Sequence, residues 1–175
     1  MRNTKQLTLC AVLTALALAL SYTERFIPLQ LLIPLPGIKL GLANIVTLIA
    51  LWMLTPKQAF MILIPRCILG AVFGGGITGL MFSLLGGIIA LGIMILAEKI
   101  PFLSIYGVSI LGAAAHSVGQ ILAAMALMRS VYIAGYLPYL LIVSIFTGFL
   151  TGAISAGILR VLPYAHISVP TDMCK

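Results

Sequence analysis

Long, uninterrupted runs of apolar residues occupy most of the chain, and short stretches with charged residues, prolines or glycines separate them. The apolar positions are continuous rather than alternating, which is typical of membrane-spanning helices and not of membrane β-strands. Two of the runs, at 40–54 and 59–73, are only about 15 residues long and would need tilt or local thinning of the bilayer to span it. We therefore predict an all-α integral membrane protein, in which residues 1–175 form a single membrane domain with six transmembrane helices. The six predicted helices are residues 7–22, 40–54, 59–73, 77–97, 105–128 and 139–162.

The two ends of the chain need separate interpretation. Arg2 and Lys5 precede the first run as in a signal peptide, and cleavage near Ser21 would leave five spans. The small residues of the first run favour an uncleaved helix instead. At the other end, residues 163–175 are polar and are expected to form a cytoplasmic tail.

The longest segment between two runs, residues 23–39, is strongly apolar between its ends but unsuited to a helix. Pro28, Pro34 and Pro36 lie within it, and each proline removes a backbone donor that a helix requires. Because an apolar loop is unstable in water, we expect this first outer loop to fold back over the helix bundle as a lid or re-entrant cap.

Composition and charge support a membrane protein and indicate its orientation. The chain is 62% hydrophobic and 7% charged, whereas about a quarter of the residues in a soluble protein are charged. The net charge is +7, but the basic residues are scattered near the ends of the runs, so no nucleic-acid surface is predicted. With the N-terminus inside, six Lys and Arg residues are cytoplasmic and three are outside, which predicts a multi-pass protein with both termini in the cytoplasm. We expect the membrane to be the plasma membrane of a bacterial cell. The cytoplasmic six are Arg2, Lys5, Lys57, Lys99, Arg160 and Lys175, and the outer three are Arg25, Lys39 and Arg129.

Arg66 is the only charged residue between Gln58 and Glu98. Near the middle of a span, an arginine costs about 2.5–3.5 kcal/mol on the insertion scale. Only three acidic residues are present and none lies in a predicted span, so a partner is available only if Glu24 swings in with its loop. The guanidinium could bind helix carbonyls or extend towards the interface, or it could hold a carboxylate or phosphate in a fork geometry.

Three further polar residues are expected at a similar depth. His116 lies near the middle of the run at 105–128, and Gln120 follows one turn later on the same face. Asn44 lies one turn below the outer end of the run at 40–54. Each of the three could form hydrogen bonds between helices, or all could line a substrate pocket with Arg66 that opens towards the outside.

The acids are too few for common catalytic arrangements. The chain has no pair of carboxylates within the spans, no aspartate-rich motif for Mg²⁺ on a diphosphate, and no phosphate-binding loop. Its three cysteines follow no metal or disulfide pattern, and Cys10 and Cys67 are expected to be buried thiols. We therefore expect no enzyme activity, no metal and no cofactor.

Small residues form two stripes at helical spacing. Ala11, Ala15 and Ala19 recur every four residues in the first run. Gly148, Gly152 and Ala156 repeat the pattern in the last one. Such stripes allow two helices to approach closely, within the bundle or at a partner surface.

Three motifs carry a resemblance to a known family. They are the run PGIKLGLANIVTL at residues 36–48, Arg66 with the following ILGAVFGG, and GAAAHSVGQ at residues 112–120. Together with the alanine stripe and the proline-rich first loop, they resemble the Gx transporter family, which is also labelled heptaprenyl diphosphate synthase component I. That family is similar to the substrate-binding S components of energy-coupling factor (ECF) transporters.

The resemblance implies a function and its partners. An S component binds a small molecule from outside, docks on a transmembrane coupling protein through its first helix, and is driven by two cytoplasmic ATPases. It implies that Ala11, Ala15 and Ala19 form the docking stripe. We expect Asn44, Arg66, His116 and Gln120 to bind a small, anionic or vitamin-like organic molecule.

Two other functions remain open from the sequence. The chain could be a non-catalytic membrane subunit associated with a heptaprenyl diphosphate synthase, which would favour a lipid-accessible groove over an enclosed pocket. A stand-alone proton-coupled carrier is disfavoured because no carboxylate lies in a predicted span, although His116 could relay protons.

Overall fold

The computed structural model describes residues 2–26, 39 and 41–161, and these residues are helical with short connections and no strand. Six α-helices are present in this part of the chain, so the expected all-helical architecture is confirmed. They are α1 (Arg2–Thr23), α2 (Asn44–Met53), α3 (Pro56–Gly70), α4 (Gly76–Glu98), α5 (Ile105–Met128) and α6 (Leu137–Val161). Three short helical turns join them: η1 (Glu24–Phe26), η3 (Ala71–Gly75) and η4 (Val131–Tyr136).

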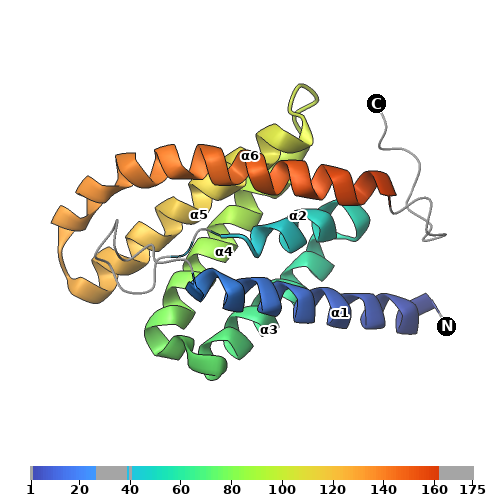
Figure 1. Ribbon diagram of the computed structural model, residues 1–175, viewed down its shortest axis with the longest axis horizontal. Coiled ribbons are helices and arrows are strands. Elements are labelled where there is room, and N and C mark those ends of the chain that lie inside the picture. Colours follow the sequence, from blue (N-terminus) through green and yellow to red (C-terminus); the bar gives the residue numbers. More distant parts are fainter. Residues whose placement is uncertain (1, 27–38, 40, 162–175) are drawn as a thin grey trace.

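The helices pack around α2. Helix α5 lies between α4 and α6, α1 packs against α3, and α2 contacts all five of the other α-helices (Figure 1). Eight of the ten residues of α2 are buried. The start of α1 and the end of α6 lie at the same end of the molecule (Figure 1).

The number of spans differs from the six that the sequence predicts. Within the described part of the chain, four helical stretches are long and apolar enough to cross a membrane, and they are Gln6–Thr23, Pro56–Glu98, Ile105–Met128 and Val131–Val161. The run at 40–54 forms only the ten-residue α2, which at about 1.5 Å per residue covers about half of the hydrocarbon core. Burial on all sides explains its apolar sequence without a span of its own. The chain is thus a membrane protein in which α2, although enclosed by the other helices, runs back towards the end of the molecule where α1 begins (Figure 1).

Helices α3 and α4 belong to one helical stretch of 43 residues that is broken by a sharp bend. Thr55 and Gln58 form a capping box that starts α3. Beyond the end of α3, Gly74 in η3 and Gly76 at the start of α4 have φ angles of 112° and 60°, which glycine adopts without a steric penalty. The bend lets α4 fold back along α3.

Close approach of backbones holds α4, α5 and α6 together. A Cβ atom at Gly119 would lie 2.7 Å from the Cα of Gly86, and one at Gly148 would lie 2.6 Å from the Cα of Ile110. Glycine is therefore required at these helix crossings. The stripe of Gly148, Gly152 and Ala156 packs within the bundle, since Gly152 lies beside Ser109 and Ala156 is buried.

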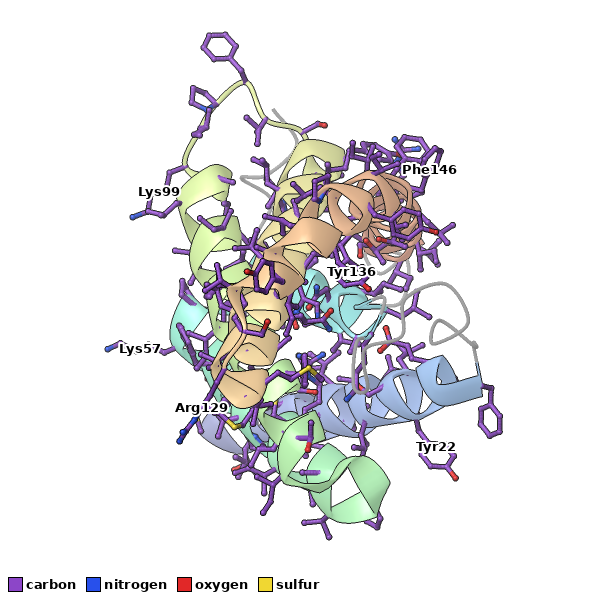
Figure 2. The ribbon with its side chains drawn as sticks, turned by 90° about the vertical axis from the view of Figure 1, so that its left-hand side faces the viewer. Tyr22, Lys57, Lys99, Arg129, Tyr136 and Phe146 are labelled. Carbon is purple, nitrogen blue, oxygen red and sulfur yellow. The ribbon has the colours of Figure 1, made fainter. Side chains whose placement is uncertain are left out.

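The outer surface suits lipid, with cations at its margins. Phe146 on α6 is largely exposed and points away from the helices (Figure 2). Lys57, Lys99 and Arg129 are exposed and also point outward (Figure 2). Arg66 is the exception among the cations of the described helices, because it is buried.

Some expectations cannot be compared with the structure. Most of the predicted lid at 23–39 and the tail at 163–175 lie outside the described residues. The N-terminal helix is described, but the side chains of Arg2, Lys5 and Arg25 are not.

Candidate binding site

The four polar residues expected in the pocket come from three helices and are all buried. Asn44 begins α2, Arg66 lies in the last two turns of α3, and His116 and Gln120 lie on α5. Their exposed fractions are between 0 and 5%. The structure therefore places all four inside the bundle, as the sequence predicts.

Close packing against glycines brings these side chains together. A Cβ atom at Gly41 would lie 3.0 Å from Asn44 Nδ2 and 3.2 Å from His116 Cδ2. On α4, a Cβ atom at Gly86 would lie 2.8 Å from His116 Nδ1. One at the next residue, Gly87, would lie 3.4 Å from an Arg66 nitrogen. The absence of side chains at these glycines makes room for the polar groups.

Arg66 and His116 line a small cavity, whereas Asn44 and Gln120 are not among its described lining residues. Its volume is about 20 Å³, enough for about one water molecule. The described lining residues are Ser21, Glu24, Lys39, Gly41, Ala43, Arg66, Cys67, Gly70, Ser83 and His116. Arg66 and His116 therefore line the cavity, and Asn44 and Gln120 lie beside His116.

Glu24 is the residue that the sequence indicates least clearly. It follows α1 directly in η1, is 4% exposed, and accepts a hydrogen bond from the Leu42 N–H. Burial raises the pKa of its carboxyl above the ordinary value, and the hydrogen bond and the charges of Lys39 and Arg66 act in the opposite direction. Glu24 thus lies inward, where its charge and that of Arg66 interact through the cavity.

The charges of the cavity do not cancel. Among the described lining residues, Lys39 and Arg66 contribute two positive charges and an ionised Glu24 contributes one negative charge, which leaves +1 for a neutral His116. Lys39 Nζ donates a hydrogen bond of 2.8 Å to Ser83 Oγ on α4. In surroundings of low dielectric constant, an excess positive charge favours an anion.

Several buried polar atoms lack partners within the described part of the chain. Gln120 Nε2 lies 3.1 Å from His116 Nε2, and because an amide nitrogen only donates, the neutral imidazole carries its hydrogen on Nδ1. His116 Nδ1, Gln120 Oε1 and both amide atoms of Asn44 then have no hydrogen bond of normal geometry there. An unsatisfied buried polar group costs about 1–3 kcal/mol. These atoms are suited to hold a water molecule or a polar guest.

A larger groove adjoins the cavity, and three residues, Ser21, Lys39 and Gly70, line both. The groove has a volume of about 510 Å³, within the range of sites for small organic molecules. Its described lining residues are Ala15, Leu18, Ala19, Ser21, Tyr22, Lys39, Gly70 and Phe73.

The alanine stripe lies on the outer face of α1. Ala11, Ala15 and Ala19 are exposed, whereas Leu13 and Ala17 on the opposite face are buried. Ala15 and Ala19 also line the groove. The stripe is thus available to a partner, and two of its members adjoin the candidate site.

No group of three or more metal-ligating side chains occurs among the described residues. Cys10 and Cys67 are buried free thiols, and Cys67 lines the cavity.

One family model matches the chain. It is the model for heptaprenyl diphosphate synthase component I, and it covers residues 13–158. No curated protein and no solved structure matches the chain. The matched region includes Asn44, Arg66, His116 and Gln120, as well as Glu24 and Lys39. The chain therefore belongs to the heptaprenyl diphosphate synthase component I family.

Proposed function

We propose that the chain is a non-catalytic membrane component that captures a small organic anion, and that it acts as the S component of an ECF-type importer. The observation that carries this proposal is the buried cavity with a net charge of +1. Buried hydrogen-bonding atoms without partners among the described residues surround it. Arg66 and Lys39 attract the anion, and Asn44, His116 and Gln120 provide hydrogen bonds to it.

The cavity has to widen for this function. Its volume of about 20 Å³ admits about one water molecule and no organic molecule of vitamin size. A ligand that binds a wider state more tightly than the present one shifts the population towards that state. In the importer, a coupling protein docked on the exposed alanine stripe and two cytoplasmic ATPases would drive release on the other side of the membrane.

A second candidate function is that of a non-catalytic membrane subunit associated with a polyprenyl diphosphate synthase. The description of the matched family supports it, as does the groove beside the positively charged cavity. Such a subunit would hold an isoprenoid diphosphate at the membrane for a catalytic partner. Glu24 is the only carboxylate among the described lining residues, which gives the chain no acid pair to hold Mg²⁺ itself.

Identification of the stable partners distinguishes the two functions. The full chain, with an affinity tag, would be purified from its native membrane in a mild detergent, and its stoichiometric partners identified by mass spectrometry. A membrane coupling protein with ATPase subunits supports the importer, and a soluble prenyl diphosphate synthase supports the second function. Recovery of the chain alone, under conditions that keep a known membrane complex of the same cell intact, would contradict both.

A further inference from the structure

We propose that the cavity and the groove form one site for an amphiphilic anion, whose charged head lies at the cavity and whose apolar chain lies in the groove between α1 and the end of α3. This inference rests on the proposed function and adds the chemical class of the ligand. It requires that the two hollows are continuous, that their polarity differs, and that the groove has room for the apolar chain. It also requires that the cavity, at about 20 Å³, widens to admit the head.

Continuity follows from the shared residues. Ser21 at the end of α1, Gly70 at the end of α3, and Lys39 line both the cavity and the groove. Gly70 has no side chain to separate them. A Cβ atom at this position would lie 3.8 Å from a methyl group of Leu18 across the groove, which is an ordinary contact distance. Gly70 and Leu18 therefore lie close together at the junction, and a larger side chain at either position would narrow it.

The polarity changes across this junction. On the cavity side lie the charged groups of Glu24 and Arg66 and the imidazole of His116. On the groove side the described lining is mainly apolar, with Leu18, the alanines of α1, and Phe73. Lys39 stands at the boundary, where its ammonium group can contact an anionic head. A molecule with a charge at one end and an apolar body matches this arrangement.

Charge and volume limit the ligand further. The net charge of +1 on the described lining is neutralised by one negative charge, so a head with one carboxylate, or with a phosphate that carries a single charge, suits the cavity better than a polyanion. The groove, at about 510 Å³, has room for a chain of moderate length. An anionic membrane lipid and a free amphiphile, such as a prenyl phosphate, share this chemistry.

The test uses the purified full chain in nanodiscs of phosphatidylcholine, which carries no net charge. Three probes are compared at about pH 5, where a phosphate monoester carries about one negative charge. They are dodecyl phosphate with head and chain, dodecanol without the charge, and methyl phosphate without the chain. Binding is measured by the shift of the thermal unfolding transition and by native mass spectrometry. We expect one dodecyl phosphate per chain, with an affinity at least about tenfold higher than that of either other probe.

Substitutions at the junction test whether the apolar chain of the ligand lies in the groove. Gly70→Leu fills the passage and should weaken dodecyl phosphate at least about tenfold, whereas Gly70→Ala should change it by less than about threefold. Leu18→Phe blocks the groove from α1 and serves as a second variant if Gly70→Leu unfolds. Methyl phosphate should bind Leu18→Phe as it binds the unchanged chain, because Leu18 lines the groove and is not among the described residues that line the cavity.

The outcomes separate this inference from the function on which it rests. Equal binding of dodecanol and dodecyl phosphate, or unchanged binding in both Gly70→Leu and Leu18→Phe, would overturn the inference. If methyl phosphate binds as tightly as dodecyl phosphate, the cavity remains a site for anions, but the groove is refuted as the site of the apolar chain of the ligand. If no anion binds, both fail. Nanodiscs with phosphatidylglycerol distinguish the source of the ligand. Competition by this lipid identifies a bilayer lipid as the ligand, whereas a lack of competition identifies a free amphiphile.

Discussion

At the scale of single residues, the charges around Arg66 determine what it can bind. An arginine within a membrane protein is costly unless other groups compensate its charge. Glu24 lines the same cavity and its carboxylate attracts both Arg66 and Lys39. One carboxylate offsets only one of these two positive charges, so the described lining keeps a net positive charge that favours an anion. Arg66 is therefore part of a three-charge cluster rather than an isolated cation.

Removal of the Arg66 charge should weaken the binding of an anion. We expect Arg66→Gln to lower the affinity for dodecyl phosphate about 10- to 100-fold, because charge-assisted hydrogen bonds contribute about 1.5–3 kcal/mol. Arg66→Lys keeps the charge but loses the fork geometry and should give an intermediate loss. Lys57→Gln removes an exposed charge from the same helix and is the matched control. Equal affinities for Arg66→Gln and the control, measured by equilibrium binding in nanodiscs, would refute the role of Arg66.

The raised pKa of Glu24 makes stability depend on pH. The folded state holds the proton of this carboxyl more tightly than the unfolded chain, because burial raises the pKa. This protonation contributes stability that is fully present below the ordinary glutamate pKa of about 4.3 and is lost as the pH rises through the folded-state pKa. Burial extends this window upward, whereas the hydrogen bond from the Leu42 N–H and the charges of Lys39 and Arg66 limit it by lowering the pKa of Glu24. His116 also lines the cavity with Glu24.

Glu24→Gln should remove this dependence while its amide oxygen still accepts from the Leu42 N–H. We expect the difference in melting temperature, unchanged chain minus Glu24→Gln, to decrease as the pH rises above about 4.3. Thermal unfolding of both proteins across a series of buffers measures it. A difference that stays constant with pH would show that the proton on Glu24 is not held more tightly after folding.

The sequence indicates only part of this cluster, for a physical reason. Arg66, His116, Gln120 and Asn44 stand out because each is a polar residue in an apolar run. Glu24 and Lys39 occupy the ends of the predicted outer loop, where a charged residue is ordinarily solvated. Their inward position depends on tertiary structure, in which Glu24 binds the backbone just before α2 and Lys39 reaches Ser83 on α4. Hydrophobic patterning contains no information on such contacts.

At the scale of elements, hydropathy predicts the positions of the helices well, but it does not predict whether lipid or protein surrounds each helix. Helix α5 has the predicted bounds, and the bend at η3 falls between the predicted helices at 59–73 and 77–97. The run at 40–54 shows the limit of the approach. A helix buried by protein on all sides and a helix in lipid are both apolar all round. The difference between them lies in the neighbours of α2, which the sequence of this run does not specify.

Glycine at the crossing of α5 and α6 should be essential for stability. Gly148→Ala places a methyl group 2.6 Å from the Cα of Ile110, a backbone atom that cannot rotate away. We expect a loss of about 1–3 kcal/mol in the free energy of unfolding and a lower melting temperature. Gly157→Ala on the same helix meets nothing within 4 Å and is the control. If both variants melt together in detergent, the close approach of these helices is not present in the protein.

The exposed alanine stripe of α1 predicts a loss of partner binding without a loss of ligand binding. Ala11 lies on this stripe but is not among the described residues that line the groove, so Ala11→Leu should disturb docking alone. We expect the yield of the co-purified partner to fall at least about tenfold while dodecyl phosphate still binds. Val12→Leu changes the neighbouring exposed position and should retain the partner. Full retention of the partner by Ala11→Leu would exclude the stripe as the docking surface.

At the scale of the whole molecule, the arrangement of the helices is compatible with both termini on one side of the membrane. The start of α1 and the end of α6 lie at the same end of the structure (Figure 1). The assignment of that end to the cytoplasm rests on the distribution of Lys and Arg alone. The two loops that flank α5 test it, because α5 has 24 residues and is about 36 Å long, more than the thickness of the hydrocarbon core.

Cysteines in these two loops should be accessible from opposite sides of the membrane. Phe102 precedes α5 and Tyr132 follows it, and their exposed fractions are 94% and 93%. In a chain whose own cysteines are replaced by alanine, a membrane-impermeant maleimide should label Tyr132→Cys in intact cells. It should label Phe102→Cys only after the membrane is opened, because positive residues place that loop inside. The reverse pattern would invert the orientation, and the candidate site would then have to be reached from the cytoplasm. Labelling of both cysteines in intact cells would show that α5 does not cross the membrane at all.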